Sequence, residues 1–413
     1  MIDRKLNIRL ILHIKQSTLI LKKRNFYMKK KSTKSLLILN LVISVALSMA
    51  HPVTPALIRK LGLPSFMFGV FFATMSLGNF IFSPIWGGLS DKKGRIKYLI
   101  IGLVGYGISQ LGFGLSTNTI VIVIFRLLGG AFVTSYLTVS IAYLTDITTK
   151  ENRLKIMSYY AACNTIGSAL GSLLGGVIGN TNYKIAFLVQ SVLCIVLSIF
   201  IYFILSETIV DTGEKVRIKL NKIKFNKLTN RVDTNLIMII LMVIIFYFSS
   251  TSYSSSINYY IESILKLPPS FNGVFLSIAG ICGFLGNLLL TSYIGKKVDD
   301  KVSFKYLTLL LGVIIFLASI TTNTNLFFVL IIIFVTISSI YVPIQQNIVT
   351  KLSKDNYGSL MGIQNSAKSM GMVLGSLFAG FIFDFGSKLP FMIAGIVLFI
   401  GFGILTRTKI DIK

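Results

Sequence analysis

Charged residues are scarce in this sequence, and acids are the scarcest of them. Of the 413 residues, 13% are charged and 54% are hydrophobic, and there are 14 Asp and Glu against 41 Lys and Arg. Soluble domains carry about 25% charged residues. The composition therefore excludes an ordinary soluble enzyme and indicates a membrane protein.

Cysteine and histidine are also rare. Cys163, Cys194 and Cys282 stand far apart inside apolar runs, so the sequence predicts neither a disulfide framework nor a metal site. The phosphate-binding pattern G-x-x-x-x-G-K and the zinc pattern H-E-x-x-H are absent from the sequence. We therefore expect no enzyme activity and no cofactor.

Long apolar runs are what the sequence has in abundance. A helix needs about 20 residues to cross the hydrocarbon layer of a bilayer, and runs of that length recur from Leu36 almost to the C-terminus. We predict an all-α membrane protein with twelve transmembrane helices in two pseudo-symmetric six-helix halves. Its predicted parts are a basic cytoplasmic tail at 1–34, a first half at 35–206, a cytoplasmic linker at 207–234, a second half at 235–406 and a cytoplasmic tail at 407–413.

The basic residues gather in alternate loops. They are dense before residue 35, at 92–97, at 150–155, in the linker and at 296–301, and sparse in the loops between. This asymmetry follows the positive-inside rule, so we expect a plasma-membrane protein with cytoplasmic termini. The net charge of +27 then needs no nucleic-acid partner, although a basic soluble protein would suggest one.

The beginning of the sequence leaves two interpretations open. Residues 1–27 have no continuous apolar segment and no small-residue cleavage site, which argues against a usual signal peptide. Met28 opens a stretch that looks like a natural start. Either residues 1–27 are an extension of the protein, or translation begins at Met28.

A short glycine pattern occurs once in each predicted half. GSALGSLLGG begins at Gly167 and GMVLGSLFAG begins at Gly371. Small residues four apart line one helix face and let a neighbouring helix approach closely. Each copy alone is typical of packing, but two copies in corresponding helices favour a duplicated transporter. The predicted packing glycines are Gly167, Gly171, Gly175, Gly176, Gly371 and Gly375.

The loop GGLSDKKGRIKYL (87–99) resembles the signature of the major facilitator superfamily between its second and third helices, with Gly87, Asp91, Gly94 and Arg95 at the matching positions. PVTP (52–55), IFRLLGGAF (124–132) and AYLTDITTKENR (142–153) are similar to motifs of the twelve-span drug:proton antiporter branch. Ser172 stands where the fifth helix of that branch usually has proline.

The resemblance implies a conformational latch at the cytoplasmic mouth. It places Asp91 against the backbone at the start of the eleventh helix, around Tyr357–Leu360, and Arg95 against Asp146. An anion at a helix N-terminus is favoured by about 0.3–2 kcal/mol, which biases a two-state equilibrium without freezing it. The alternative is a solvated basic loop, which explains the lysines but not the spacing of Gly87, Asp91 and Gly94.

Two basic residues are predicted well inside the membrane, where a charge costs about 2.5–3.5 kcal/mol. Arg126 belongs by resemblance to a proton-coupling region, and its alternative role is to bind backbone carbonyl groups. Lys368 shares a helix face with Gly375, and we expect this face to pack on the second helix near Asn79. Lys368 is then either an anion-binding residue or a lysine held by Asn79 and backbone carbonyls.

The sequence offers no carboxylate in the middle of the first six helices. If protons drive transport, Glu262 is the first candidate and Asp384 the second, and both fall near external helix ends. A histidine side chain ordinarily titrates near neutral pH, which makes His51 a further candidate, with a structural role as its alternative. The remaining cavity candidates are neutral hydrogen-bonding side chains, namely Asn40, Asn164, Gln345, Gln364 and Asn365.

These observations predict a secondary transporter that alternates between two conformations around a central site. We expect it to lie in the lipid bilayer as a monomer and to export hydrophobic or drug-like small molecules, driven by an ion gradient of protons. Two alternatives stay open. One is uptake or exchange of an anionic metabolite, and the other is a transporter-like sensor that binds a ligand without moving it.

Overall fold

Twelve helices long and apolar enough to cross a membrane lie in the described part of the chain, which confirms the predicted fold class. The structure is a computed structural model, and it describes residues 33–209, 234–351 and 357–407. Most of the predicted tails and most of the predicted linker lie outside the described residues. The spans are Thr33–Lys60, Met67–Lys93, Ile96–Leu115, Thr119–Ile147, Ile156–Gly179, Tyr183–Ile204, Leu236–Ile264, Pro269–Thr291, Asp300–Ile320, Thr324–Val349, Ile363–Phe383 and Leu389–Arg407.

Within each half the helices follow one another with short connections, and the described residues contain no strand. Two π-helical turns, η2 and η3, continue α9 and α10, and π-helical turns are frequent at functional sites. After the first span begins at Thr33, the elements are η1 (His51–Val53), α2 (Thr54–Lys60), α3 (Met67–Lys93), α4 (Ile96–Leu115), α5 (Thr119–Ile147), α6 (Lys150–Gly179), α7 (Tyr183–Ile204), α9 (Thr234–Tyr259), η2 (Tyr260–Ile264), α10 (Pro269–Gly286), η3 (Asn287–Thr291), α11 (Ser292–Lys297), α12 (Asp300–Ile320), α13 (Thr324–Lys351), α14 (Tyr357–Phe383) and α15 (Leu389–Arg407).

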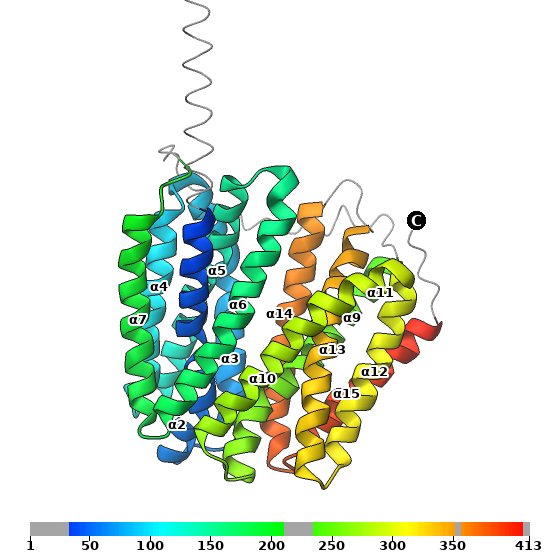
Figure 1. The fold of residues 1–413 in the computed structure, drawn as a ribbon. Helices are drawn as coiled ribbons and strands as arrows, with labels where there is room; N and C mark the ends of the chain where they lie inside the picture. The colour runs from blue at the N-terminus through cyan, green and yellow to red at the C-terminus, as the bar shows by residue number, and fades with distance from the viewer. Residues whose placement is uncertain (1–32, 210–233, 352–356, 408–413) are drawn as a thin grey trace, which may run out of the picture.

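The helices stand roughly parallel in one bundle, with the first six beside the last six (Figure 1). Because the number of spans is even, the described chain begins and ends at the same end of the bundle. We call this end the linker face, because residues 207–209 also lie there after α7. The other end is called the opposite face.

The glycine pattern of the sequence corresponds to the same helix packing in each half. A Cβ atom on Gly171 would overlap the carbonyl oxygen of Val45 in the first span, and one on Gly375 would overlap the carbonyl oxygen of Phe248 in α9. The fifth span therefore packs on the first as the eleventh packs on the seventh. This repeat relates the two halves.

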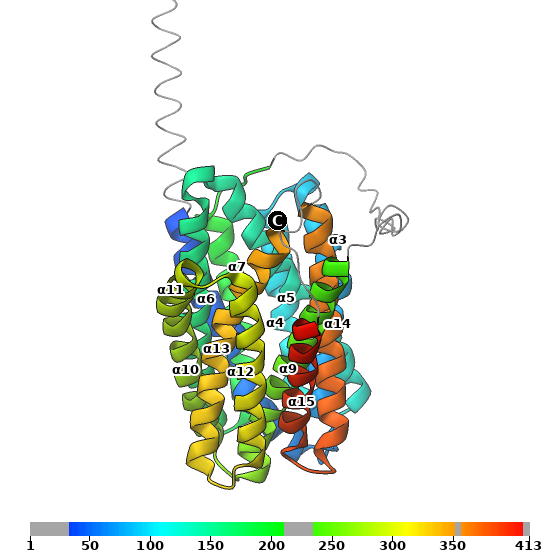
Figure 2. The ribbon, with the colours of Figure 1, turned by 90° about the vertical axis from the view of Figure 1, so that its right-hand side faces the viewer.

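The two halves meet through α3 with α14 and through α6 with α10, and α3 and α14 lie side by side in Figure 2. Near the opposite face, Gly69 of α3 is so close to Gly380 of α14 that a Cβ on Gly69 would lie 2.8 Å from the Cα of Gly380. Gly176 of α6 and Gly273 of α10 form the second such contact, with 3.1 Å between the corresponding atoms. These small residues let the halves touch backbone to backbone.

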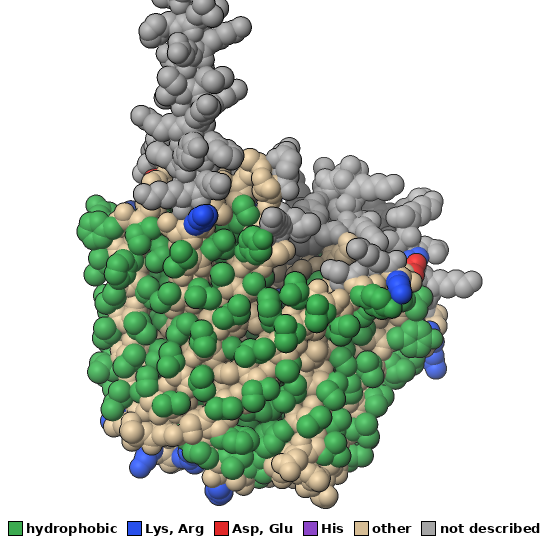
Figure 3. Space-filling model, in the orientation of Figure 1, with side chains coloured by type: hydrophobic (Ala, Val, Ile, Leu, Met, Phe, Trp, Pro, Cys, Tyr) green, Lys and Arg blue, Asp and Glu red, His purple; other side chains and the backbone are tan. Residues whose placement is uncertain are grey.

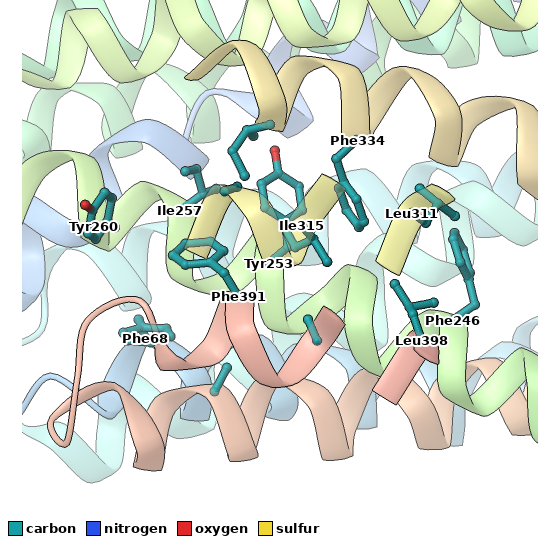
Figure 4. Packing of buried hydrophobic residues seen from close by; sticks show 14 of the residues in the cluster. Phe68, Phe246, Tyr253, Ile257, Tyr260, Leu311, Ile315, Phe334, Phe391 and Leu398 are labelled. Atoms are coloured by element: carbon teal, nitrogen blue, oxygen red, sulfur yellow. The ribbon is translucent and has the colours of Figure 1, made fainter. Parts of the chain in front are cut away.

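Hydrophobic side chains cover the flank of the bundle, and Lys and Arg side chains gather at its ends (Figure 3). Many large apolar side chains of the spans are exposed, such as Ile120, Phe203 and Leu289. In water such a surface would aggregate, but it suits the hydrocarbon of a bilayer. Inside, rings and branched side chains interdigitate, as Phe391 does with Tyr260 at a centroid distance of 5.8 Å (Figure 4).

Candidate functional site

Arg95 is the centre of a charged cluster at the linker face. It precedes α4, and its side chain is 7% exposed. Its Nη1 donates to Asp91 Oδ1 at 2.5 Å, and its Nε donates to Asp146 Oδ2 at 3.0 Å. The contact between Arg95 and Asp146 that the resemblance implies is therefore present. It ties the end of α3 to the end of α5.

The environment of Arg95 keeps its guanidinium charged. Burial alone would lower the pKa of Arg95, but hydrogen bonds to Asp146 and Asp91, with their negative charges, raise it above its ordinary value. Ser90 also accepts a hydrogen bond from Arg95 Nη1, at 2.8 Å. The cluster thus contains a permanent cation between two carboxylates.

Glu207 is a member of this cluster that the sequence analysis missed. Its carboxylate accepts hydrogen bonds from the backbone N–H of Arg95 at 2.7 Å and of Ile96 at 2.9 Å, which places an anion at the N-terminus of α4. The next residue, Thr208, donates its hydroxyl to Asp146 at 3.0 Å. The first residues after α7 are therefore bound to the same carboxylate as Arg95. An acid directly after the sixth span was the available signal.

The geometry gives Gly94 and Gly87 different roles. Gly94 has φ +94°, and a Cβ there would lie 2.7 Å from Oε2 of Glu207, so both its backbone and its neighbour require glycine. A Cβ on Gly87 would meet its nearest atom, of Thr138, at an ordinary 3.8 Å. Gly87 instead offers its carbonyl oxygen to Ser90.

The described contacts of the linker-face cluster involve the first half of the chain and the first residues of the predicted linker, Glu207 and Thr208. The predicted contact of Asp91 with Tyr357–Leu360 falls on residues whose side chains lie outside the described part, and it remains a prediction. The described contacts join α3, α5 and residues 207–208, and the expectation that the guanidinium and the carboxylate clasp the two halves stays a prediction.

A second charged cluster joins the halves at the opposite face. Arg59, in α2, places Nη2 3.0 Å from Oε2 of Glu262, in η2. Oε1 of Glu262 accepts a hydrogen bond from Asn272 Nδ2 at 3.3 Å, so both carboxylate oxygens are bound. The Glu262 side chain is fully buried, whereas that of Arg59 is 37% exposed.

Asp384 lies near this ion pair and also links the halves. It accepts a hydrogen bond from Ser65, in the connection between α2 and α3. Arg59, Ser65 and Asp384 line a cavity of about 420 Å³ together with Lys266. The opposite-face cluster, defined as Arg59, Ser65, Glu262, Asn272 and Asp384, therefore contains both acids that the sequence proposes for proton coupling.

His51 begins η1 one residue before Pro52, whose carbonyl oxygen accepts from Asn272 at 3.5 Å. The imidazole stacks on the ring of Phe72 with a centroid distance of 6.2 Å. His51 thus lies near the opposite-face cluster, and this ring contact fits its structural alternative.

Arg126 lies about two turns into α5 and is 3% exposed. Its Nε donates to the carbonyl oxygen of Phe71 at 3.3 Å, and its guanidinium carbon lies 4.5 Å from the centroid of the Phe113 ring. In the described part of the chain, no acid lies within 4.0 Å of it. These are the contacts that the structural alternative for Arg126 predicts.

Lys368 contacts a different helix from the one predicted. Gly371 and Gly375, on its helix face, approach Ile244 and Phe248 of α9 rather than the second span. The ammonium of Lys368 lies 5.0 Å from the centroid of the Tyr247 ring, also on α9. The expected pairing with Asn79 is therefore wrong, because α14 turns this face toward its own half and meets α3 along another face, near Gly380.

The neutral candidates divide into two groups. Asn40 is fully buried, donates to Asn164 Oδ1 at 2.8 Å and accepts from the Tyr136 hydroxyl at 3.0 Å, so this pair lies in a network between the first and fifth spans. In the second half, Gln364 is buried and Asn365 exposed. Gln345 is fully buried, and neither of its amide atoms has a hydrogen-bond partner.

The comparisons with known proteins agree with this geometry. The sequence profile of the Major Facilitator Superfamily matches residues 36–353 and 239–410. The chain belongs to this superfamily. Multidrug resistance protein 2 of Bacillus subtilis (strain 168) is 23% identical over 380 residues, which cover 91% of this chain and 95% of the relative. Quinolone resistance protein NorA of Staphylococcus aureus (strain COL) is 22% identical over 360 residues, covering 86% and 90%.

Solved structures of two membrane transporters have the same fold. A mutant form of the nucleoside transporter NupG superposes with a TM-score of 0.76 at 12% identity and covers 91% of this chain and 100% of its own. A bacterial homologue of the human lysosomal transporter Spinster, in an inward-facing and occupied conformation, gives 0.73 at 12% identity, covering 92% and 97%. The family and fold of this chain are therefore those of membrane transporters.

Proposed function

We propose that this protein exports hydrophobic, drug-like small molecules by alternating access, in exchange for protons. The observation that carries the proposal is the position of its two charged clusters. One joins the two halves at the opposite face, and the other joins α3, α5 and residues 207–208 at the linker face. Relatives named for multidrug and quinolone resistance cover nearly the whole chain, which supports drug-like substrates.

The distribution of basic residues supports an orientation. Lys92, Lys93, Arg95 and Lys97 lie at the linker face, and Lys296, Lys297 and Lys301 join them, whereas the opposite face has Arg59, Lys60, Lys184, Lys266 and Lys388. By the positive-inside rule the linker face is cytoplasmic. The opposite face is then external, and we place the protein in the plasma membrane with both termini inside.

In this orientation the opposite-face cluster closes the outer side of the transporter. For the halves to separate there, Glu262 must lose Arg59 while its carboxylate is still held among residues of the second half. An unpaired buried carboxylate is costly and is relieved by taking up a proton. Opening toward the outside therefore favours proton uptake by Glu262, and closing with Arg59 favours its release.

The linker-face cluster acts in the opposite sense as a conformational latch. Arg95 holds Asp91 and Asp146 in place, and Glu207 fixes the start of α4. When the halves approach at this face, Asp91, whose side chain is 62% exposed here, becomes available to the N-terminus of α14. This contact stabilises the conformation that is closed at the linker face, whereas the opposite-face cluster stabilises the conformation that is closed at the opposite face.

Transport in inside-out membrane vesicles tests the proposal. A panel of cationic dyes and organic anions is offered with and without an acidic lumen, and vesicles without the protein measure passive partition. We expect the acidic lumen to drive accumulation of at least one compound and nigericin, which collapses the pH gradient, to abolish it. If no compound of the panel accumulates more with the acidic lumen than without it, proton exchange is contradicted.

A second candidate function is the exchange of an anionic metabolite. Two basic side chains, Arg126 and Lys368, lie well inside the spans, and in the described part of the chain neither forms an ion pair with an acid. If this function is correct, uptake responds to a second anion preloaded in the lumen and is unaffected by nigericin.

A further inference from the structure

The cavity at the opposite face lies between the two halves of the bundle. Its volume is about 420 Å³, which falls within the range of about 300–1,000 Å³ that small-molecule sites occupy. Arg59 and Ser65 of the first half line it, together with Lys266, Asp384 and Ser387 of the second half. Lys266 and Asp384 are exposed, so a ligand can reach the cavity from this face. Because both halves supply its lining, the cavity is complete only while they are in contact here.

Two charges of this cavity have no ionic partner in the described part of the chain, and they are of opposite sign. The charge of Arg59 is balanced by Glu262, at 3.0 Å. The side chain of Lys266, by contrast, forms neither an ion pair nor a hydrogen bond with any described residue. Asp384 accepts a hydrogen bond from Ser65 at Oδ1, and its Oδ2 has no partner among the described residues. A ligand that carries one negative and one positive group would match the two charges.

The backbone of Lys266 is a second, independent observation. Its φ is +59°, and among the described residues it is the one non-glycine residue with a positive φ. The N–H of the next residue, Leu267, bonds to the carbonyl oxygen of Ile261 at 3.1 Å, as at helix ends where glycine usually takes this conformation. Non-glycine residues held in this region cluster at functional sites and ligand clamps. A lysine here therefore fits a role of its side chain in the cavity better than a role in ending the helix.

Aromatic rings adjoin these charges. Tyr259 and Phe383 line the cavity, and their ring centroids are 5.4 Å apart. Phe68 of the first half packs on both rings, with centroid distances of 5.3 Å and 5.1 Å. Rings grouped in this way offer a surface on which another flat ring can pack. The cavity thus combines an aromatic surface with one unpaired cation and one unpaired carboxylate.

From these observations we infer that the cavity is a binding site for a small aromatic zwitterion, such as an aromatic α-amino acid. The carboxylate of the ligand pairs with the ammonium of Lys266, and the ammonium of the ligand donates to Oδ2 of Asp384. The ring of the ligand lies against Tyr259 and Phe383. This inference goes beyond the proposed function, because it concerns a ligand of the closed opposite face and not the exported compound.

Equilibrium binding tests the site with three probes that share one indole ring. The full chain is placed in phosphatidylglycerol nanodiscs, whose lipid is not a zwitterion, and is titrated with tritiated L-tryptophan, tryptamine and indole-3-propionate. Empty nanodiscs correct for partition into lipid. We expect L-tryptophan, which carries both charges, to bind at least about tenfold more tightly than either probe with one charge.

Removing each charge should affect a different pair of probes. We expect Lys266→Gln to weaken binding of L-tryptophan and indole-3-propionate about tenfold to a hundredfold and not to weaken binding of tryptamine. Asp384→Asn keeps an acceptor for Ser65, and it should weaken L-tryptophan and tryptamine but not indole-3-propionate. Lys266→Arg should retain binding of all three probes. Equal weakening of the three probes by either charge-removing variant, or no weakening of any, overturns the proposal.

Lys60 supplies a matched control, because it is an exposed lysine of α2 at the same face that does not line the cavity. Lys60→Gln should leave all three titrations unchanged, and a loss equal to that in Lys266→Gln overturns the proposal. So does the absence of saturable L-tryptophan binding. A zwitterionic lipid headgroup is the rival occupant, so loss of L-tryptophan binding when phosphatidylethanolamine is added to the nanodiscs also overturns it.

The outcome is separable from that of the proposed function, since binding in nanodiscs needs no gradient. Vesicles that fail to transport while the charge-dependent binding persists reject the transport proposal alone. Proton-driven transport together with charge-independent binding rejects the zwitterion site alone.

Discussion

Arg59 and Glu262 belong to different halves of the bundle, and their side chains meet with Nη2 3.0 Å from Oε2. This ion pair, the hydrogen bond between Ser65 and Asp384 and the approach of Gly69 to Gly380 all lie at the opposite face. The halves are therefore held together at that end, and alternating access requires these contacts to break in each cycle.

Replacing Glu262 should uncouple transport from protons. Glu262→Gln keeps the shape of the side chain and its hydrogen bond to Asn272 but removes the titrating group. We expect substrate-dependent proton movement, measured with a pH-sensitive dye trapped in proteoliposomes, to fall at least about tenfold, as expected when one essential proton-transfer group is lost.

Asp384→Asn is the matched comparison for Glu262→Gln, because Asp384 is exposed and bound to Ser65 rather than to an arginine. It should retain most of the proton movement. If both variants show the same substrate-dependent proton movement as the unmodified protein, Glu262 is not the proton site.

Removing the charges of the linker-face cluster should slow transport without preventing membrane insertion. Arg95→Ala removes the cation that connects Asp91 with Asp146. Asp91→Asn removes the anion that is predicted to meet the N-terminus of α14. We expect lower transport rates for both in proteoliposomes at equal protein content. Normal rates in both variants would remove the latch from the account.

Gly94→Ala should damage the same cluster through its geometry. A side chain at φ +94° is strained by about 1–3 kcal/mol, and its Cβ would push against the carboxylate of Glu207 at 2.7 Å. We expect a lower melting temperature and slower transport. Gly88→Ala is the control, since a Cβ there meets no atom within 4 Å, and an equal loss in Gly88→Ala would contradict this explanation.

The repeated glycines should be required for packing in both halves. Gly171→Ala and Gly375→Ala place a Cβ against the backbone of the first span and of α9, respectively, and backbone cannot move aside as a side chain does. Overpacking of this kind costs about 1–3 kcal/mol. We expect both variants to melt at lower temperature in detergent, whereas Gly403→Ala, in open space on α15, should melt like the unmodified protein.

The sequence predicts the fold well because its signals are local. Apolar length gives the spans, and the resemblance of the loop at 87–99 to the family signature implies the pairing of Arg95 with Asp146. Glu207 could not be predicted as a member of the cluster, because an acid after a span is typical of a linker. Only the fold brings it to the N-terminus of α4. Lys368 was assigned the wrong neighbour because helical spacing gives the shared face with Gly375, but not which helix that face meets.

The most direct test of alternating access is to join the halves at the opposite face. In the double variant Ser65→Cys with Asp384→Cys, made after Cys163, Cys194 and Cys282 are replaced by serine, a short thiol cross-linker bridges two residues that are in contact here. The account predicts that cross-linking stops transport and that a reducing agent cleaving the linker restores it. Undiminished transport by the fully cross-linked protein would contradict it.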